Sequence, residues 1–334
     1  MVLRIVNRLG ALLGTPQLLR QVSRQQAASE EKLDRLFRKF HAASAENQQL
    51  LLQELRQLNR RLARQEHRSA SAEALRASGI DLSHAFGAPE IGPHVERAIA
   101  SAALVTDPMP HLVAANLLPQ VTYDAVIGGL PPEVCFNERD KVKKNMRLEH
   151  AHGSPDWTIR MLTFLEQTLI PRMLAPALLR RFEPFIQDVY VERFGAEHAA
   201  ALARLPHTAS AGRLMLRRPG YHLDPHLDPK RVVVTTLLYF ARPHDDEAFG
   251  TTFYRMQGTP VFEASNTLFP ELQGVACTPV RSTPFRANTA VAFLNFGGAH
   301  GAGIPEDAPA DTQRYAYQFY LSPDRSAAAA ICGD

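Results

Sequence analysis

Two apolar segments in the last third of the chain each lie next to a histidine. Residues 232–240 follow closely on His226-Leu227-Asp228, and residues 290–296 come shortly before His300. Short apolar runs rich in β-branched and aromatic residues predict buried strands. Residues i and i+2 of an extended segment project from the same face, so His226 and Asp228 can converge on one point. The chain is therefore expected to place two imidazoles and one carboxylate at the ends of strands in a β-rich fold.

Two His and one carboxylate on one side of a metal, with the other positions open, are typical of non-heme Fe(II) sites. A second His-x-Asp, His222-Leu223-Asp224, lies four residues upstream, and spacing alone does not exclude it. The residues around His300 are small, which would let a metal centre approach the backbone. The other interpretation of His300 is a loop histidine that binds nothing.

Five sequence pieces, in this order, resemble the catalytic core of the 2-oxoglutarate and Fe(II)-dependent dioxygenases, in the branch similar to prolyl 4-hydroxylases. They are 217–221, 226–228, 236–240, 250–254, and 292–295 continuing through His300-Gly301 to Arg314-Tyr315. The resemblance is strongest over residues 213–321 and fainter over 107–212. It implies a mainly β fold with flanking helices, built on a double-stranded β-helix or jelly roll, after a long N-terminal helix or coiled coil.

The resemblance also implies the cofactors and their ligands. Fe(II) would bind His226, Asp228 and His300, with 2-oxoglutarate as co-substrate, O2 as oxidant and ascorbate as a candidate reductant. No residue beyond the metal centre receives a catalytic role. The family pattern favours His226-x-Asp228 over the upstream pair, because a Gly-Tyr pair precedes its metal-binding His by several residues and a Pro often adjoins it. Pro225 fits that place.

Arg314 is the residue that the resemblance assigns to the distal carboxylate of 2-oxoglutarate. A guanidinium suits this role because it can bind a carboxylate bidentately and does not lose its proton. Arg314 follows His300 by 14 positions, where the family has about ten. The intervening segment is rich in Pro, Gly and Asp, so it predicts a longer loop. The Ser or Thr that often helps to hold this carboxylate is Ala316 here. Tyr239 is the candidate for the missing hydroxyl, and a core tyrosine is the alternative.

The N-terminal quarter has a different composition from the remainder. Residues 29–76 contain no Pro or Gly and are rich in Leu, Gln, Arg, Ala and Glu, which favours a long helix. Leucines at 51, 55, 58 and 62 predict a short or imperfect coiled coil, and so does the 33, 37, 40 series. A helix packed on its own catalytic domain is equally compatible. We expect residues 1–85 to form a helical, basic region and residues 86–334 a dioxygenase domain, with its jelly-roll core at about 107–322.

Charge also divides the chain. Residues 1–85 hold 14 Lys or Arg against 8 Asp or Glu, whereas the remaining residues hold 23 against 26. Residues 1–24 carry four Arg and no acid among several leucines, so they could contact an anionic membrane surface. Residues 29–76 could form a homo-oligomer. Nucleic-acid binding is not expected, because the positive charge has no interleaved aromatic residues.

Two stretches before the core have expected structures. Residues 107–119 are expected to hold the opening strand of the fold and to lead into a helix that carries Tyr123. From Trp157 to about Phe185 an amphipathic pattern predicts a helix divided by three prolines, at 171, 176 and 184.

Cys135, Cys277 and Cys332 are odd in number and far apart, which argues against a disulfide framework and favours a reducing cytoplasm. The expected location is therefore cytoplasmic, and residues 1–24 could add a peripheral contact with a membrane.

The expected reaction is hydroxylation of an unactivated C–H bond, with release of succinate and CO2. We expect a small-molecule or glycan substrate. A protein side chain, as in prolyl hydroxylation, is the alternative, and a non-catalytic jelly-roll binding protein is the second functional class. The loops 137–155 and 256–285, expected to shape the pocket, contain no motif that names a substrate.

Overall fold

The computed structural model describes residues 31–32, 34–35, 38, 45–136, 140–262 and 266–332. The chain divides into two compact units, Met1–Glu66 and His67–Asp334. The basic segment 1–24 and the apolar series at 33, 37 and 40 lie outside the described residues, so their predicted roles stay predictions.

The helices and strands follow one another along the described chain, with most helices before most strands. The helices are α3 (Ala45–Ser78), α4 (Leu82–Gly87), α5 (Ile91–Ser101), α6 (Gln120–Gly128), α7 (Asp156–Phe164), α8 (Ala175–Phe194), α9 (Ala196–Ala203) and α10 (Arg325–Cys332). The strands are β1 (Leu104–Val105), β2 (His111–Ala114), β3 (Lys143–Met146), β4 (His207–Ala209), β5 (Arg213–Arg217), β6 (His222–His226), β7 (Val234–Tyr239), β8 (Thr251–Met256), β9 (Cys277–Thr283), β10 (Thr289–Leu294), β11 (Gly298–Gly303) and β12 (Arg314–Pro323).

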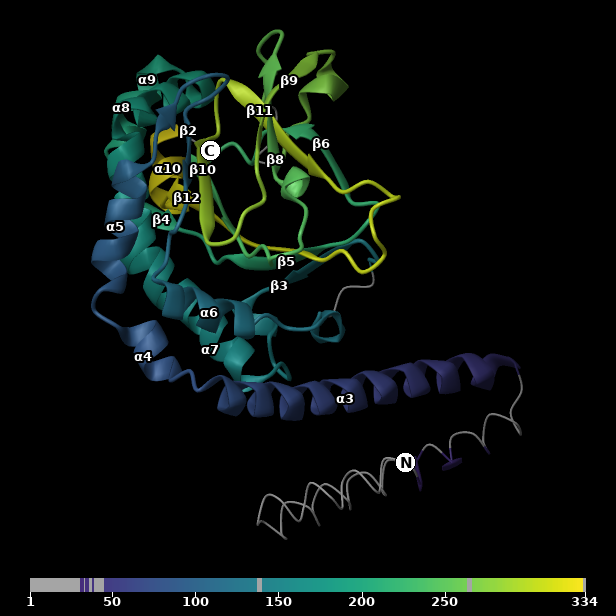
Figure 1. Cartoon of the computed structure of the whole chain (residues 1–334). Helices are drawn as coiled ribbons and strands as arrows, with labels where there is room; N and C mark the ends of the chain where they lie inside the picture. The colour runs from purple at the N-terminus through teal and green to yellow at the C-terminus, as the bar shows by residue number, and fades with distance from the viewer. Residues whose placement is uncertain are drawn as a thin grey trace. The chain divides into compact units, whose positions relative to one another are not determined.

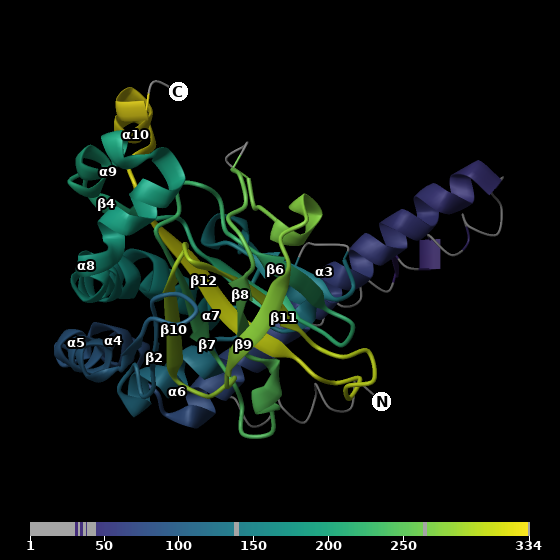
Figure 2. The same cartoon turned by 90° about the horizontal axis from the view of Figure 1, so that it is seen from above.

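Two antiparallel sheets form the centre of the second unit. The larger sheet has the strand order β1-β2-β10-β7-β12-β5-β3, with β4 paired to β12, and the smaller sheet has the order β6-β11-β8-β9. The smaller sheet stands over one face of the larger sheet, and α5, α8 and α9 lie on the other side (Figure 1; Figure 2). This arrangement confirms the predicted double-stranded β-helix with flanking helices.

Alternation along the central strands divides the core into two layers. On β12, Tyr315, Tyr317 and Phe319 pack in the cluster that the helices share, whereas Ala316 packs between the two sheets. The cluster between the sheets also contains Phe253 of the smaller sheet. The inner face of β12 therefore carries residues 314, 316 and 318, because side chains in a strand alternate between faces. This face forms the floor of the site.

The stretch from Asp156 to Phe194 is one continuous helical run rather than a helix divided at its prolines. Its middle part, Leu165–Leu174, has π-helical hydrogen bonding and contains Pro171. A wider turn accommodates a proline that an α-helical turn would exclude. Pro176 lies where the hydrogen bonding changes from π-helical to α-helical, in the first turn of α8. Buried residues of α8, such as Leu178 and Phe182, belong to the core that the helices share with the larger sheet.

The long N-terminal helix is present as α3 (Ala45–Ser78). Within the first unit, Leu55, Leu58 and Leu62 are half-buried, whereas Leu50 is 63% exposed. Coiled-coil formation and self-association through this helix stay predictions. Of the helices described, none combines the length and the apolar composition that a membrane span requires.

Candidate metal centre

Three side chains meet where the smaller sheet faces the larger one. His226 ends β6, Asp228 follows two residues later, and His300 lies on β11 directly opposite His226 in the strand pairing. One donor atom from each of the three residues lies within 4.8 Å of the others, and all three side chains are buried. The structure thus brings together the three residues that the sequence predicts as ligands.

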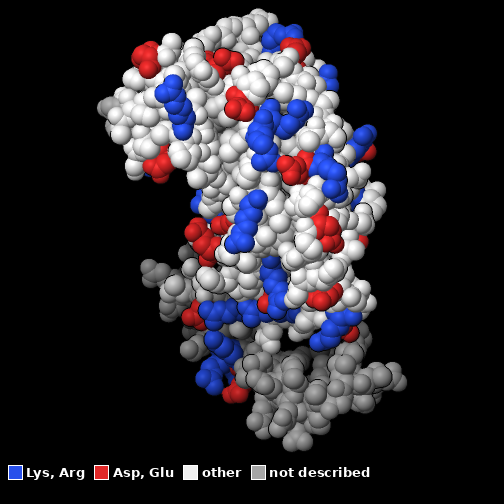
Figure 3. Space-filling model, turned by 90° about the vertical axis from the view of Figure 1, so that its left-hand side faces the viewer, with Lys and Arg blue, Asp and Glu red and all other residues white. Residues whose placement is uncertain are grey.

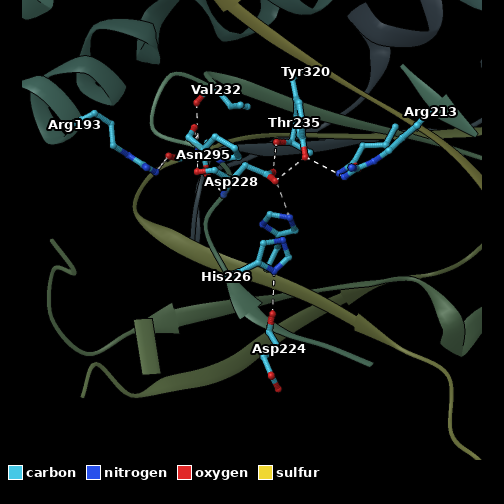
Figure 4. Close-up of polar contacts among 12 residues, drawn as sticks. Arg193, Arg213, Asp224, His226, Asp228, Val232, Thr235, Asn295 and Tyr320 are labelled. Carbon is cyan, nitrogen blue, oxygen red and sulfur yellow. Dashed lines mark hydrogen bonds and ion pairs between the residues drawn. The ribbon is translucent and has the colours of Figure 1, made fainter. Parts of the chain in front are cut away.

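Both imidazoles are suited to bind a metal in their neutral form. His226 Nδ1 is 2.9 Å from the backbone oxygen of Asp224, and an N–H there leaves Nε2 free (Figure 4). Such a second hydrogen bond fixes the ring and its tautomer. The two imidazole rings are 4.1 Å apart between centroids. Burial, and then the neighbouring His226, lower the pKa of His300 to about 3, so His300 is uncharged at neutral pH.

Asp228 receives hydrogen bonds on both carboxylate oxygens. Thr235 Oγ1 donates to Oδ2 at 2.5 Å and the Tyr320 hydroxyl donates to Oδ1 at 3.0 Å (Figure 4). Burial alone would raise the pKa of this carboxyl group, but His300, His226 and the two hydroxyl donors outweigh it, so the pKa lies below its usual value. The carboxylate is therefore ionised and oriented without a metal.

The backbone that carries Asp228 is held by Asn295, which follows β10. Asn295 Oδ1 accepts the N–H of Asp228 at 2.9 Å, and Nδ2 donates to the carbonyl of Asp228 at 3.0 Å. The buried Arg193 of α8 donates to the Asn295 carbonyl and lies 3.9 Å from the Phe262 ring centroid. Figure 4 shows this line of contacts from Arg193 through Asn295 to Asp228. Arg193 of α8, on the outer side of the larger sheet, thus supports the loop that carries Asp228 on the inner side.

The upstream pair lies elsewhere. The side chains of His222 and Asp224 are 72% and 65% exposed, and they bond to each other at 2.8 Å. Neither side chain belongs to the buried cluster. The geometry therefore favours His226 and Asp228 as the metal-binding pair.

A cavity of about 330 Å³ opens between the sheets from the group formed by His226, Asp228 and His300, and Arg314 lines this cavity. Arg314 is buried, its Nε donates to the backbone oxygen of Phe249, and its guanidinium carbon lies 5.2 Å from the Phe285 ring centroid. Among the described residues, neither terminal nitrogen of Arg314 has a partner. Two parallel N–H donors in a buried cavity match a carboxylate.

Tyr239 is placed differently from the sequence expectation. It is fully buried, and its hydroxyl lies 2.6 Å from Thr251 Oγ1 and 3.1 Å from Thr283 Oγ1. Its ring centroid is 5.4 Å from the Arg314 guanidinium carbon. Thr251, rather than Tyr239, is among the cavity-lining residues. The structure thus places Tyr239 beside Arg314, and direct contact of its hydroxyl with a co-substrate stays a prediction.

Sequence reasoning missed Thr235, Tyr320 and Asn295 as partners of Asp228. Asn295 lay within a matched piece of the sequence but received no role. Thr235 carries a weak signal, because it is a polar residue within an apolar strand. Tyr320 has no recognisable signal in the sequence, because only the pairing of β12 with β7 places it opposite Thr235.

No family model and no curated protein matches the sequence. Among solved structures, one similar to this chain is a prolyl 4-hydroxylase from Phytophthora capsici, with 14% identity and a TM-score of 0.38, covering 74% of this chain and 66% of that one. A Pseudomonas putida prolyl-4-hydroxylase has 16% identity and a TM-score of 0.33, covering 70% and 99%. A 2OG-Fe(II) oxygenase family oxidoreductase from Burkholderia pseudomallei has 12% identity and a TM-score of 0.35, covering 64% and 84%. TM-scores below 0.5 are too low to transfer an activity, so the function depends on this chain's own residues.

The donor set fits ferrous iron. Two imidazoles and one ionised carboxylate, with no fourth His, Cys, Asp or Glu in the described cluster, leave coordination positions for exogenous ligands. The adjoining cavity is lined by Arg314, a buried cation that can bind a carboxylate through two N–H groups. The arrangement can hold a metal together with a ligand that carries a carboxylate at its far end.

Proposed function

We propose that this chain is a 2-oxoglutarate- and Fe(II)-dependent dioxygenase that hydroxylates an unactivated C–H bond and releases succinate and CO2. The observation that carries the proposal is the buried cluster of His226, Asp228 and His300 at one cavity, with Arg314 presenting two free donors to the same space. Bound iron and 2-oxoglutarate would together supply the oxidising chemistry, which side chains lack.

The chain's own residues would bind, orient and exclude water. His226, Asp228 and His300 would hold the metal, and Arg314 would hold the distal carboxylate of the co-substrate. Thr235 and Tyr320 keep Asp228 in one orientation through their hydrogen bonds. The rings of Phe293 and Phe269 lie against the imidazoles, at centroid distances of 4.4 Å from His300 and 5.8 Å from His226. These apolar walls limit the access of water to the centre.

We further propose a small molecule or a glycan as substrate, with a protein side chain as the alternative. A cavity of about 330 Å³ is near the lower end of the range for small-ligand sites, about 300–1,000 Å³. Cys135, Cys277 and Cys332 form no disulfide bond, which supports a reducing compartment such as the cytoplasm.

Anaerobic loading with Fe(II) and 2-oxoglutarate tests the proposal. Wild-type protein should bind one iron and show the visible charge-transfer absorbance of the complex. His226→Ala should lose both, and the matched exposed control His222→Ala should retain both. Unchanged iron and absorbance in His226→Ala would refute the ligand assignment. Tight binding of zinc without any 2-oxoglutarate-dependent absorbance would favour a non-catalytic binding protein. Absence of succinate formation with every substrate tested would favour the same conclusion.

A further inference from the structure

Three cations form a row on the inner face of the larger sheet. Arg314 of β12 pairs with Arg217 of β5, and Arg217 pairs with Lys143 of β3. Directly opposed residues on neighbouring strands project from the same face, with Cβ atoms about 5 Å apart. All three residues line the cavity at the metal cluster, and so does Arg213, four residues before Arg217 on the same strand. The cavity is therefore rich in positive charge.

Within the described part of the chain, none of these four cations forms a side-chain salt bridge. Asp140 lies close to Lys143: its carboxylate accepts the backbone N–H of Lys143 at 2.9 Å and interacts with the charge of this lysine. The nearby Glu133 pairs instead with Lys144 and Arg218. On the helix-covered side of the molecule, side chains of both signs are interspersed (Figure 3). Charge of one sign therefore does not dominate that face.

Arg217 is the most constrained of the row. It is 2% exposed, and its terminal nitrogens donate to the backbone oxygen of Lys144 at 2.6 Å and to Asn145 Oδ1 at 2.9 Å. Its buried Nε has no partner among the described residues. Burial, with smaller contributions from Arg314 and Arg213, lowers the pKa of Arg217. A buried cation with an unused donor and no counter-ion is costly unless a ligand supplies the anion.

The co-substrate of the proposed function does not supply enough negative charge. Ferrous iron, Asp228, a doubly charged 2-oxoglutarate and Arg314 together sum to zero. Arg213 is already engaged by Gln318 and by Tyr320 in support of the metal ligand. Arg217 remains without a counter-ion, and Lys143 has only the exposed Asp140 of its own loop nearby.

We infer, on the basis of the proposed function, that the substrate itself carries an anionic group, a carboxylate or a phosphate, which Arg217 and Lys143 bind. Arg217 supplies a fixed, buried donor beside the co-substrate site. Lys143 is exposed and supplies a mobile cation at the end of the row. Together they set the distance between the anion and the C–H bond presented to the metal, so they determine specificity.

The test uses the full chain loaded anaerobically with Fe(II) and saturating 2-oxoglutarate. Calorimetry measures the binding of three probes of similar size: phenyl phosphate, benzoate and the neutral benzyl alcohol. Absorbance measures 2-oxoglutarate affinity separately. The variants are Arg217→Gln, Arg217→Lys, Lys143→Gln and Arg314→Gln. The matched control is Arg218→Gln, whose side chain contacts Glu133 and the Ala310 carbonyl instead of the cavity.

We expect an anionic probe to bind wild type at least about tenfold more tightly than benzyl alcohol, and Arg217→Gln to remove most of this preference, since one charged hydrogen bond contributes about that factor. Which anion binds more tightly distinguishes a phosphorylated from a carboxylated substrate. Lys143→Gln should weaken anion binding less, and Arg217→Lys should retain part of it. Arg314→Gln should instead weaken 2-oxoglutarate binding, and Arg218→Gln should change neither affinity.

Two results overturn the inference while the proposed function stands. The first is formation of the iron–2-oxoglutarate complex without any preference for anionic probes. The second is loss of 2-oxoglutarate affinity in Arg217→Gln as large as in Arg314→Gln, which would make Arg217 a second anchor of the co-substrate. Absence of the complex in wild type would refute both proposals. If Arg217→Gln does not fold, Lys143→Gln decides, because its exposed side chain leaves the core unchanged.

Discussion

Tyr320 links two parts of the site at the scale of single residues. Its hydroxyl donates to Asp228, and Arg213 Nη2 donates to the same hydroxyl oxygen at 3.3 Å. Because Arg213 can only donate, it leaves the hydroxyl proton of Tyr320 for the carboxylate. Arg213 of β5 therefore helps to orient the Asp228 carboxylate, which it does not touch.

Tyr320→Phe should weaken iron binding about tenfold, because a hydrogen bond to an ionised group contributes about 1.5–3 kcal/mol and outer contacts of metal ligands typically change affinity 10–100-fold. The change keeps the ring and removes one donor. Iron titration under anaerobic conditions measures it, with Tyr254→Phe on β8 as the control. Equal iron affinity in Tyr320→Phe and wild type would show that Thr235 alone orients Asp228.

His111 of β2 is a buried titratable residue outside the group of His226, Asp228 and His300. Its Nδ1 lies 2.8 Å from the Met109 carbonyl, and burial lowers its pKa. The folded state therefore favours the neutral imidazole. Above the unfolded pKa of about 6.5 the ring is neutral in both states, and protonation of the unfolded state lowers the free energy of unfolding as pH falls below that value. The unfolding free energy of iron-free protein should decrease from pH 7.5 to 5.5, and His111→Gln should reduce that decrease. Urea unfolding at both pH values tests this, with exposed His244→Gln as the control; equal decreases in wild type and His111→Gln would contradict it.

At the scale of elements, the pairing of β11 with β6 fixes the distance between the two imidazoles. The register shifts between His300 and Ala302, so Gly301 lies at a bulge. A Cβ at Gly301 would lie 2.7 Å from the Leu223 backbone oxygen. The sequence suggested that small residues here make room for a metal, but at Gly301 the room is filled by the neighbouring strand.

Gly301→Ala should therefore push β11 away from β6 and displace His300. We expect loss of most iron binding together with a lower melting temperature. Gly303→Ala is the matched control, because its Cβ would meet no atom closer than 3.4 Å. Iron content and thermal unfolding of the two variants decide the point. Normal iron content in Gly301→Ala would mean that the strands separate without moving His300.

At the scale of the whole molecule, residues 82–86 pack against other residues of the second unit. Phe86 stacks on Phe164 with ring centroids 4.7 Å apart, and Thr122 Oγ1 donates to the Ala85 carbonyl at 2.8 Å. Leu82 and Ala85 are buried beside Trp157. The start of the compact unit at His67 is therefore the better place for truncation than residue 86 or Ala88.

A chain that begins at His67 should fold and bind iron, and it should form smaller oligomers than the full chain if α3 mediates association. A chain that begins at Ala88 should be several kcal/mol less stable, because each buried Leu or Phe side chain contributes about 1.5–3 kcal/mol. Light scattering, iron content and urea unfolding compare the two. Loss of iron on truncation at His67 would show that the first unit belongs to the catalytic fold, whereas unchanged stability at Ala88 would show that α4 is dispensable.

Local sequence indicated several of the strands, the candidate metal-binding pair His226 and Asp228, and the candidate anchor Arg314. Two-residue alternation and the His-x-Asp spacing are properties of one short segment, so they can be read without knowing the fold. Tertiary structure decided which groups surround those residues. Tyr320 reaches Asp228, and Arg217 stands between Arg314 and Lys143, through pairings among β3, β5, β7 and β12. Strand order and register between segments far apart in the chain follow from packing of the whole core, so no local pattern could assign the partners of Asp228 or the row of cations.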